Sequence, residues 1–325
     1  MTTPLFHPTL PPADDESYLA PLQIVLEWLT RVNQWHIRRS LRRFEKGLAQ
    51  TFVPPIYVSG VKYRPRDPGQ SDWLDMRAVL QRRSGDSEDL AAWRAAELRV
   101  HGVDAEPVVG WQWSPTRSSG RSPSGGSGRW IVHSCVRLPD GTIEDPSEKL
   151  GRRGFPDRPA PTRPLLHLSL PDTNDAAHFA PLQIALEGLT DLDTWQIMRA
   201  RRLAREGRAP SALPPLYESG VYYKEEAPGH EDWIDAPGVL AQGFADCEDL
   251  AAWRCAELRA DGVDVEPVIK WQWIPRAVMI QQGYPADKLP SRGVWLVHCC
   301  VRYPDGTIED PSKILGMGGN FTERI

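Results

Sequence analysis

Residues 246–259 read DCEDLAAWRCAELR, and residues 86–99 read DSEDLAAWRAAELR. In both stretches acidic residues precede an alanine- and leucine-rich run, a pattern that predicts a helix starting near position 247 and near position 87. The stretches differ at two positions. The first of these is the head of the predicted helix, which is Cys247 in one copy and Ser87 in the other.

The repeat extends over most of the chain. The motif Pro-Leu-Gln-Ile at 21–24 returns at 181–184, and Trp-Gln-Trp at 111–113 returns at 271–273. Because the repeating unit is much longer than a solenoid repeat, the sequence predicts two tandem copies of one domain.

The domain boundaries follow from where the repeat begins and ends. We place the first domain at 1–151 and the second at 165–325. The segment between them, at 152–164, reads RRGFPDRPAPTRP, and its proline content predicts a semi-extended linker.

The composition is typical of a globular protein, with 41% hydrophobic and 25% charged residues. No run of 18 apolar residues occurs, and residues 1–16 lack the basic start and apolar core of a secretion signal. A net charge of -5 gives no overall attraction to nucleic acid or to an anionic membrane, so we expect neither partner. Five cysteines without a spaced framework predict free thiols in a reducing compartment.

Each copy is expected to be α+β, with a helical N-terminal part packed on a small antiparallel sheet. In the first copy a long helix at 20–47 precedes a short strand at 56–63 and the central helix. Apolar strands at 105–113 and 130–137 and a last strand at 142–147 complete the domain. The second copy repeats this order.

Three residues of the second copy form a candidate nucleophile set: Cys247, His298 and Asp310. Cys247 heads a helix, where unpaired backbone N–H groups and the helix dipole favour a thiolate. The neighbouring Glu248 and Asp249 oppose that negative charge, so a nearby imidazolium would be needed. His298 lies in an apolar strand, where a histidine requires a polar partner.

The turn Pro304-Asp305-Gly306 decides whether His298 and Asp310 can meet. It fits a three-residue loop with its glycine in the left-handed region, and this loop pairs Tyr303 with Thr307. Strand alternation then places Asp310 on the face that carries His298. A two-residue turn would send Asp310 to the opposite face.

The order Cys, His, Asp, with the cysteine heading a helix and the other two on adjacent strands, resembles the transglutaminase-like superfamily of the papain-like fold. The motifs ADCEDLA at 245–251 and DGTIEDPS at 305–312 are similar to those of its bacterial and phage-encoded members. The resemblance implies that Cys247 is the nucleophile, His298 the base and Asp310 the orienting acid.

The first copy departs from this family pattern at the nucleophile. It has Ser87 there while keeping His133 and Asp145, so we expect a degenerate, non-catalytic site, with a serine hydrolase as the alternative. The second copy departs at Ala245, where the family pattern and the first copy (Gly85) have glycine.

The surroundings of the set are less defined by the sequence. The backbone N–H of Cys247 is the expected first oxyanion donor, and Trp233 and Gln242 are candidates for a second donor or for lining the site. Trp233 recurs in the first copy, which also fits a structural anchor. The apolar loop at 274–293 is expected to form a wall or lid of the site, or else an interface.

Zinc is a rival interpretation, with Cys247, His298 and Cys300 as ligands. No C-x-x-C pair occurs, and the adjacent Cys299 and Cys300 point to opposite faces of a strand, so we expect no metal. Cys299 and Cys255 are expected to be inert buried thiols.

These residues and the resemblance predict amide hydrolysis or acyl transfer through a cysteine acyl-enzyme, acting on a protein or peptide substrate without a cofactor. The alternative is a non-catalytic structural or binding protein that uses the duplicated fold in a large assembly such as a phage virion. Either function implies a cytoplasmic or virion-associated protein.

Overall fold

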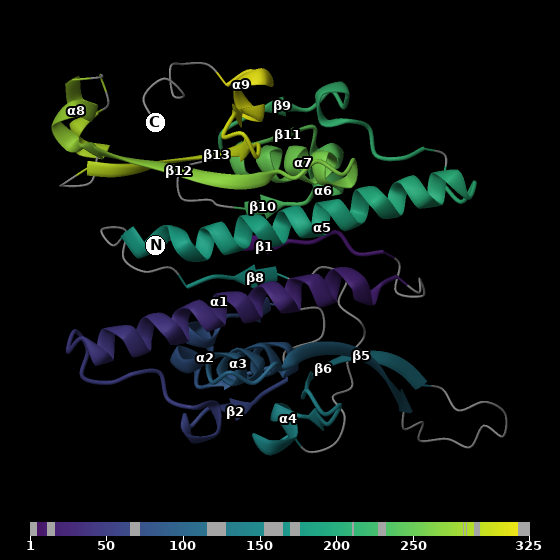
Figure 1. The fold of residues 1–325 in the computed structure, drawn as a ribbon, viewed down its shortest axis with the longest axis vertical. Helices are drawn as coiled ribbons and strands as arrows, with labels where there is room; N and C mark the ends of the chain where they lie inside the picture. The colour runs from purple at the N-terminus through teal and green to yellow at the C-terminus, as the bar shows by residue number, and fades with distance from the viewer. Residues whose placement is uncertain are drawn as a thin grey trace. The chain divides into compact units, whose positions relative to one another are not determined.

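The computed structural model describes residues 5–11, 17–65, 72–115, 128–152, 165–169, 176–209, 211–226, 232–281, 283, 285–288 and 293–317. The chain divides into two compact units, Met1–Ser169 (unit one) and Leu170–Ile325 (unit two). Both are mixed α+β, with helices packed on small sheets (Figure 1). In the described ranges, no helix is long and apolar enough to cross a bilayer.

The elements of unit one are, in chain order, β1 (Leu5–His7), α1 (Leu19–Glu45), η1 (Ile56–Val58), β2 (Lys62–Tyr63), β3 (Asp72–Leu74), α2 (Met76–Arg82), β4 (Ser84–Gly85), α3 (Ser87–Val100), β5 (Glu106–Pro115), β6 (Gly128–Arg137), β7 (Ile143–Glu144), α4 (Pro146–Lys149) and β8 (Leu165–His167).

The elements of unit two are η2 (Ala176–His178), α5 (Phe179–Arg205), η3 (Leu216–Glu218), β9 (Tyr222–Tyr223), β10 (Asp232–Ile234), α6 (Ala236–Gln242), β11 (Phe244–Ala245), α7 (Cys247–Ala260), β12 (Glu266–Pro275), α8 (Arg276–Gln281), η4 (Ala286–Lys288), β13 (Gly293–Arg302), β14 (Ile308–Glu309) and α9 (Pro311–Ile314).

The predicted order of a long helix, a central helix and an antiparallel sheet is confirmed in both units. The long helix α5 packs on the central helix α7, and both contact the antiparallel sheet β12–β13–β14; α1, α3 and β5–β6–β7 do the same in unit one. The centre of each core is the central helix, where Trp93 and Trp253 are completely buried. Each unit also has a two-stranded parallel pair, β2–β4 or β9–β11, which the sequence did not predict.

The strand predicted at 56–63 is wrong over most of its length. Ile56–Val58 is a 3-10 helix, and only Lys62–Tyr63 is extended. The cause is local, because Ser59 bonds the backbone on both sides of itself and Gly60 has a φ of 78°. Unit two repeats this arrangement in η3 and β9.

Strand β8 belongs to unit one, although the repeat places its residues at the start of the second copy. It pairs antiparallel with β1 and parallel with β3. Just after it, Ser169 Oγ donates to Asp75 Oδ1 at 2.8 Å. Of the predicted linker at 152–164, the described part is Arg152.

The two units bury different polar groups at one equivalent point of their cores. In unit one, Asn33 Oδ1 accepts from the backbone N–H of Met76 at 2.8 Å. In unit two, Asp193 Oδ1 accepts from the N–H of Ala236 at the same distance. Asp193 is completely buried, and its pKa is raised well above the ordinary value because burial and the nearby Asp235 oppose its charge.

Asp193→Asn is expected to stabilise unit two at neutral pH by about 1–3 kcal/mol, since the amide keeps the hydrogen bond and removes a buried ionisable group. Because folding raises this pKa, the wild-type chain loses stability as pH rises above the ordinary value of 3.8. Urea unfolding at several pH values should show a flatter pH dependence in the variant. The reverse change in unit one, Asn33→Asp, should destabilise; equal pH dependence of wild type and Asp193→Asn would contradict the prediction.

Candidate functional site

Cys247 occupies the first position of α7, as the sequence predicted. The preceding strand β11 pairs in parallel with β9, which fixes the entry into the helix. Unit one has the same register, with Gly85 beside Tyr63 where unit two has Ala245 beside Tyr223. Ala245 is buried in the core and keeps the strand pairing that Gly85 has in unit one.

The predicted turn after β13 is confirmed. Val301 pairs with Glu309, and the N–H of Tyr303 donates to the carbonyl oxygen of Thr307 at 2.9 Å. Gly306 has a φ of 86°, the left-handed conformation that this turn requires. The turn therefore sets the register that brings Asp310 to the face of His298.

His298 and Asp310 form a buried pair. His298 Nε2 lies 2.9 Å from Asp310 Oδ2, and the two side chains are 3% and 9% exposed. The predicted last strand ends at Glu309, because Asp310 caps α9 through the N–H of Lys313 at 3.1 Å and Pro311 begins that helix. The aspartate thus both starts a helix and orients the imidazole.

The charge state of this pair follows from its surroundings. Burial lowers the pKa of His298, but the hydrogen bonds and charges of Asp310 and Cys247 outweigh it and raise the pKa to about 9. Burial raises the pKa of Asp310, yet the bond to His298 and the backbone bond hold it below its usual range. At neutral pH the pair is an imidazolium and a carboxylate.

An ion pair behind the sheet holds Asp310 in place. Arg254, two turns along α7 from Cys247, donates to Glu309 Oε1 at 2.6 Å. The hydroxyls of Tyr217 and Tyr303 also donate to Glu309. Because neighbouring residues of a strand face opposite sides, fixing Glu309 toward α7 turns Asp310 toward His298.

The Cys247 thiol contacts two residues of β13. It lies within hydrogen-bonding reach of the Cys299 thiol and of the His298 imidazole. Its Sγ is also 3.3 Å from Glu248 Oε2. Cys299 is buried, as predicted, and it is the thiol beside Cys247, whereas Cys300 groups with His298 and Asp310.

The expected lowering of the Cys247 pKa is not what this environment produces. The hydrogen bond with Cys299 and burial raise the pKa of Cys247 well above its ordinary value, and the bond with His298 offsets this only in part. The helix start therefore does not yield a thiolate at neutral pH by itself, and the Cys247 proton can pass to His298 only when that imidazole is neutral.

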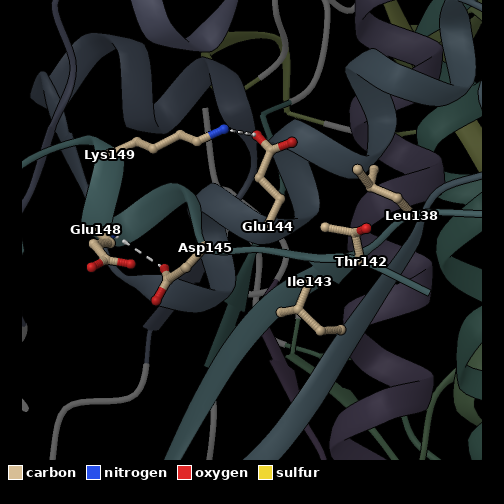
Figure 2. A pocket seen from close by; sticks show the side chains of 7 residues that line it. All are labelled: Leu138, Thr142, Ile143, Glu144, Asp145, Glu148 and Lys149. Atoms are coloured by element: carbon tan, nitrogen blue, oxygen red, sulfur yellow. Dashed lines mark hydrogen bonds and ion pairs between the residues drawn. The ribbon is translucent and has the colours of Figure 1, made fainter. Parts of the chain in front are cut away.

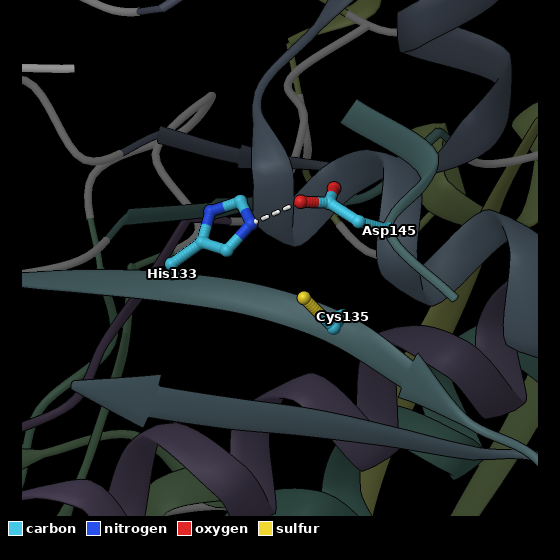
Figure 3. A group of neighbouring side chains, drawn as sticks. All are labelled: His133, Cys135 and Asp145. Atoms are coloured by element: carbon cyan, nitrogen blue, oxygen red, sulfur yellow. Dashed lines mark hydrogen bonds and ion pairs between the residues drawn. The ribbon is translucent and has the colours of Figure 1, made fainter. Parts of the chain in front are cut away.

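Unit one keeps the histidine–aspartate pair without a thiol nucleophile. His133 Nε2 lies 2.9 Å from Asp145 Oδ2, and Cys135 is two residues further along the strand (Figure 3). Arg152 covers this pair, since its Nη1 lies 2.7 Å from His133 Nε2 and its Nη2 lies 3.1 Å from Asp145 Oδ2. Met317 follows α9 at the equivalent place in unit two.

Ser87 is held by local hydrogen bonds. Its Oγ donates to Glu88 Oε2 at 3.1 Å, while its backbone N–H donates to the side chain of Asp86 at 2.8 Å. The structure of unit one therefore gives its serine no base, because His133 is engaged by Asp145 and Arg152.

A pocket of about 340 Å³ lies beside this degenerate pair, around β7 and α4 (Figure 2). The residues lining it are Leu138, Thr142, Ile143, Glu144, Asp145, Glu148 and Lys149. Lys149 Nζ lies 3.2 Å from Glu144 Oε1, so these two charged side chains of the pocket lining form an ion pair with each other.

The two candidates for a second oxyanion donor lie in different environments. Trp233 is 4% exposed on β10, beside the first turn of α7, where the N–H of Ile234 donates to Asp249 at 2.8 Å. Its indole N–H is buried with no hydrogen-bond partner in the described part of the chain. Gln242 is exposed, and its amide donates to the carbonyl oxygen of Phe244 at 2.7 Å, a purely local bond.

The described part of the expected lid lies on the hairpin away from His298. Residues 276–281 form α8, which packs on β12 and β13 at the end of the hairpin away from α9 (Figure 1). His298 lies five positions beyond Gly293, where β13 begins, a separation of about 17 Å along a strand. Of the apolar residues in this loop, Met279 is buried and Tyr284 lies outside the described residues.

The sequence reasoning missed Cys299 and Arg152. A signal for Cys299 was present: the positions of Cys247 and Cys299 are both serine in the first copy, Ser87 and Ser134. Comparison with protein-family models, curated proteins and solved structures finds no match to this chain.

Ser134→Ala is expected to stabilise unit one by about 1 kcal/mol. The Ser134 hydroxyl is completely buried and has no hydrogen-bond partner in the described ranges, so its removal relieves an unsatisfied polar group. Chemical denaturation measures the change. Ser147→Ala, at another buried serine with the same property, serves as a comparison; loss of stability in Ser134→Ala would count against this assignment.

The imidazole of His298 is expected to titrate at about pH 9. In Asp310→Asn the pKa should fall toward or below the ordinary 6.5, because burial remains while the anionic partner is lost. NMR titration of labelled histidine side chains measures both values, with His298→Gln to assign the resonance. A wild-type value near 6.5 that Asp310→Asn leaves unchanged would show that the pair is not coupled.

Proposed function

We propose that unit two carries out thiol acyl chemistry of the transglutaminase-like, papain-like kind on amide bonds of a protein or peptide. The observation that carries this proposal is one continuous contact path. Cys247 at the start of α7 touches His298, and His298 is held 2.9 Å from Asp310. Nucleophile, base and orienting acid in that order are the minimum that this chemistry needs.

In this mechanism His298 takes the proton of Cys247 as sulfur attacks the amide carbonyl carbon. Asp310 stabilises the imidazolium that results. Collapse of the tetrahedral intermediate breaks the C–N bond, and the imidazolium gives its proton to the leaving amine. Water or a second amine then attacks the thioester carbonyl and regenerates the thiol, which gives hydrolysis or acyl transfer respectively.

The start of α7 can stabilise the oxyanion. In unit one the side chain of Asp86 caps α3 and accepts from the N–H of Ser87. In unit two the side chain of Asp246 makes no capping bond to α7, which leaves the N–H of Cys247 clear of that competitor. A backbone N–H at a helix start is a suitable donor to a developing negative oxygen.

Unit one is proposed to be non-catalytic. Ser87 is a weak nucleophile without a base, and Arg152 lies against both members of the pair that would supply one.

An activated peptide ester or thioester is expected to acylate Cys247, as seen by intact mass and peptide mapping. The rate should rise with pH through about 9, because His298 accepts a proton only when it is neutral. Cys247→Ala and His298→Ala should lose the adduct, whereas Ser87→Ala should behave as wild type. An adduct rate that is unaffected by His298→Ala would rule out the proposed base.

The second candidate function is a non-catalytic structural or binding protein of a large assembly, with a phage virion as one setting. The observation in its favour is that unit one keeps the histidine–aspartate bond at 2.9 Å although serine, not cysteine, begins α3. Asp145 also caps α4 there, so the pair has a structural role of its own. Acylation confined to Cys247 would decide for the enzyme; no adduct at any pH would decide for the scaffold.

A further inference from the structure

A second group of side chains surrounds Cys247, distinct from the path to Asp310. Ligand-type atoms of Cys247, Glu248 and Cys299 all lie within 4.8 Å of one another. Cys299 is 2% exposed and Glu248 is 5% exposed. Two thiols and a carboxylate thus converge at the edge of the core, where a carboxylate requires a cation or hydrogen bonds.

The comparison of the units shows that the two thiols occur together. Unit one has Ser87 and Ser134 at the positions of Cys247 and Cys299, while it keeps the carboxylate as Glu88. The local geometry is also kept, since Ser87 Oγ lies 3.1 Å from Glu88 Oε2 and Cys247 Sγ lies 3.3 Å from Glu248 Oε2. Sulfur is therefore present at both positions or at neither.

We propose that unit two binds one Zn²⁺ through Cys247 Sγ, Cys299 Sγ and the carboxylate of Glu248. A tetrahedral Zn²⁺ with Zn–S bonds of about 2.3 Å places its two sulfurs about 3.8 Å apart and a sulfur and an oxygen about 3.5 Å apart. The 3.3 Å between Cys247 Sγ and Glu248 Oε2 matches such an edge. Thiolate ligands select zinc over calcium and magnesium.

His298 supplies or controls the fourth position. It contacts the Cys247 thiol, and its Nε2 is held by Asp310. A histidine whose second nitrogen is held by a carboxylate is the arrangement that orients imidazole ligands of zinc. The imidazole can therefore bind the metal or hydrogen-bond a water molecule on it.

Metal binding releases two protons, because both thiols bind as thiolates: two R–SH groups and Zn²⁺ give a zinc dithiolate and two H⁺. A zinc-bound Cys247 is not free to attack a carbonyl, so the metal would inhibit the acyl chemistry. That consequence rests on the proposed function, but the metal site itself does not.

The other histidine–cysteine–aspartate groups do not share this property. His133, Cys135 and Asp145 form such a group in unit one, but the guanidinium of Arg152 already lies against its nitrogen and oxygen atoms. His298, Cys300 and Asp310 repeat that group in unit two, with the imidazole nitrogen committed to the aspartate. The paired thiols distinguish the Cys247 group from both.

Cobalt provides the test. Full-length chain, reduced with a phosphine and stripped with a chelator, is titrated with Co²⁺ alone and followed by absorption. One equivalent should give a thiolate-to-cobalt charge-transfer band and the visible bands of a four-coordinate ion, and Zn²⁺ should bleach both because it binds such sites more tightly.

The second unit supplies matched variants. Cys247→Ser and Cys299→Ser restore the residues of unit one and should weaken binding by about 100-fold or more, beyond the 10–100-fold typical of losing an outer-shell partner. Cys300→Ala removes the adjacent thiol on the opposite face and should leave binding unchanged. Ser87→Cys combined with Ser134→Cys should create a second equivalent in unit one, where Glu88 is already in place.

Three outcomes would overturn the proposal. The first is no charge-transfer band in a chain that circular dichroism shows to be folded, and the second is a band that survives Cys299→Ser. The third is fewer than five free thiols in the denatured, metal-free chain before the phosphine is added, which would indicate a disulfide instead. Acylation of Cys247 is measured separately on metal-free chain. Absence of acylation would refute the acyl chemistry without affecting the cobalt result. Absence of cobalt binding would refute the metal site without affecting the acylation result.

Discussion

The ion pair between Arg254 and Glu309 is the contact on which the site of unit two depends. Arg254 lies on the helix that Cys247 begins, and Glu309 immediately precedes Asp310. This ion pair therefore positions both Cys247 and Asp310. It sets where α7 lies along the sheet and which way Asp310 faces. Both side chains are less than a quarter exposed, so loss of one partner would leave a largely buried charge. Arg94 and Glu144 make the same bond in unit one, at 2.8 Å.

Features encoded by neighbouring residues could be predicted from the sequence. The start of α7 and the turn at Gly306 each depend on a few adjacent residues, and the turn alone carried the prediction that His298 meets Asp310. The prediction of a strand at 56–63 was wrong because it overlooked neighbouring residues of this kind. A serine–glycine turn inside the segment outweighs its β-branched residues. The contacts of Cys299 and Arg152 could not be derived in this way, since they depend on how one element packs on another.

The two units show which parts of this fold tolerate chemical change. The scaffold contacts recur almost atom for atom: the tryptophan in the central helix, the arginine–glutamate bond and the histidine–aspartate bond. The differences at equivalent buried points include Asn33 against Asp193 and the serine pair against the cysteine pair. Both copies of the duplicated domain thus keep the same fold, while the side chains at the candidate site differ between them.

The position of β8 means that the folded body of unit one does not end where the first sequence repeat ends. Its last strand follows residues 153–164 in the chain, yet that strand pairs with β1 and β3, which are synthesised more than 90 residues earlier. Unit one cannot finish folding on the ribosome until the first residues of the second repeat have emerged. A nick within the linker would likewise leave two fragments, of which the C-terminal one still carries a strand of the N-terminal body.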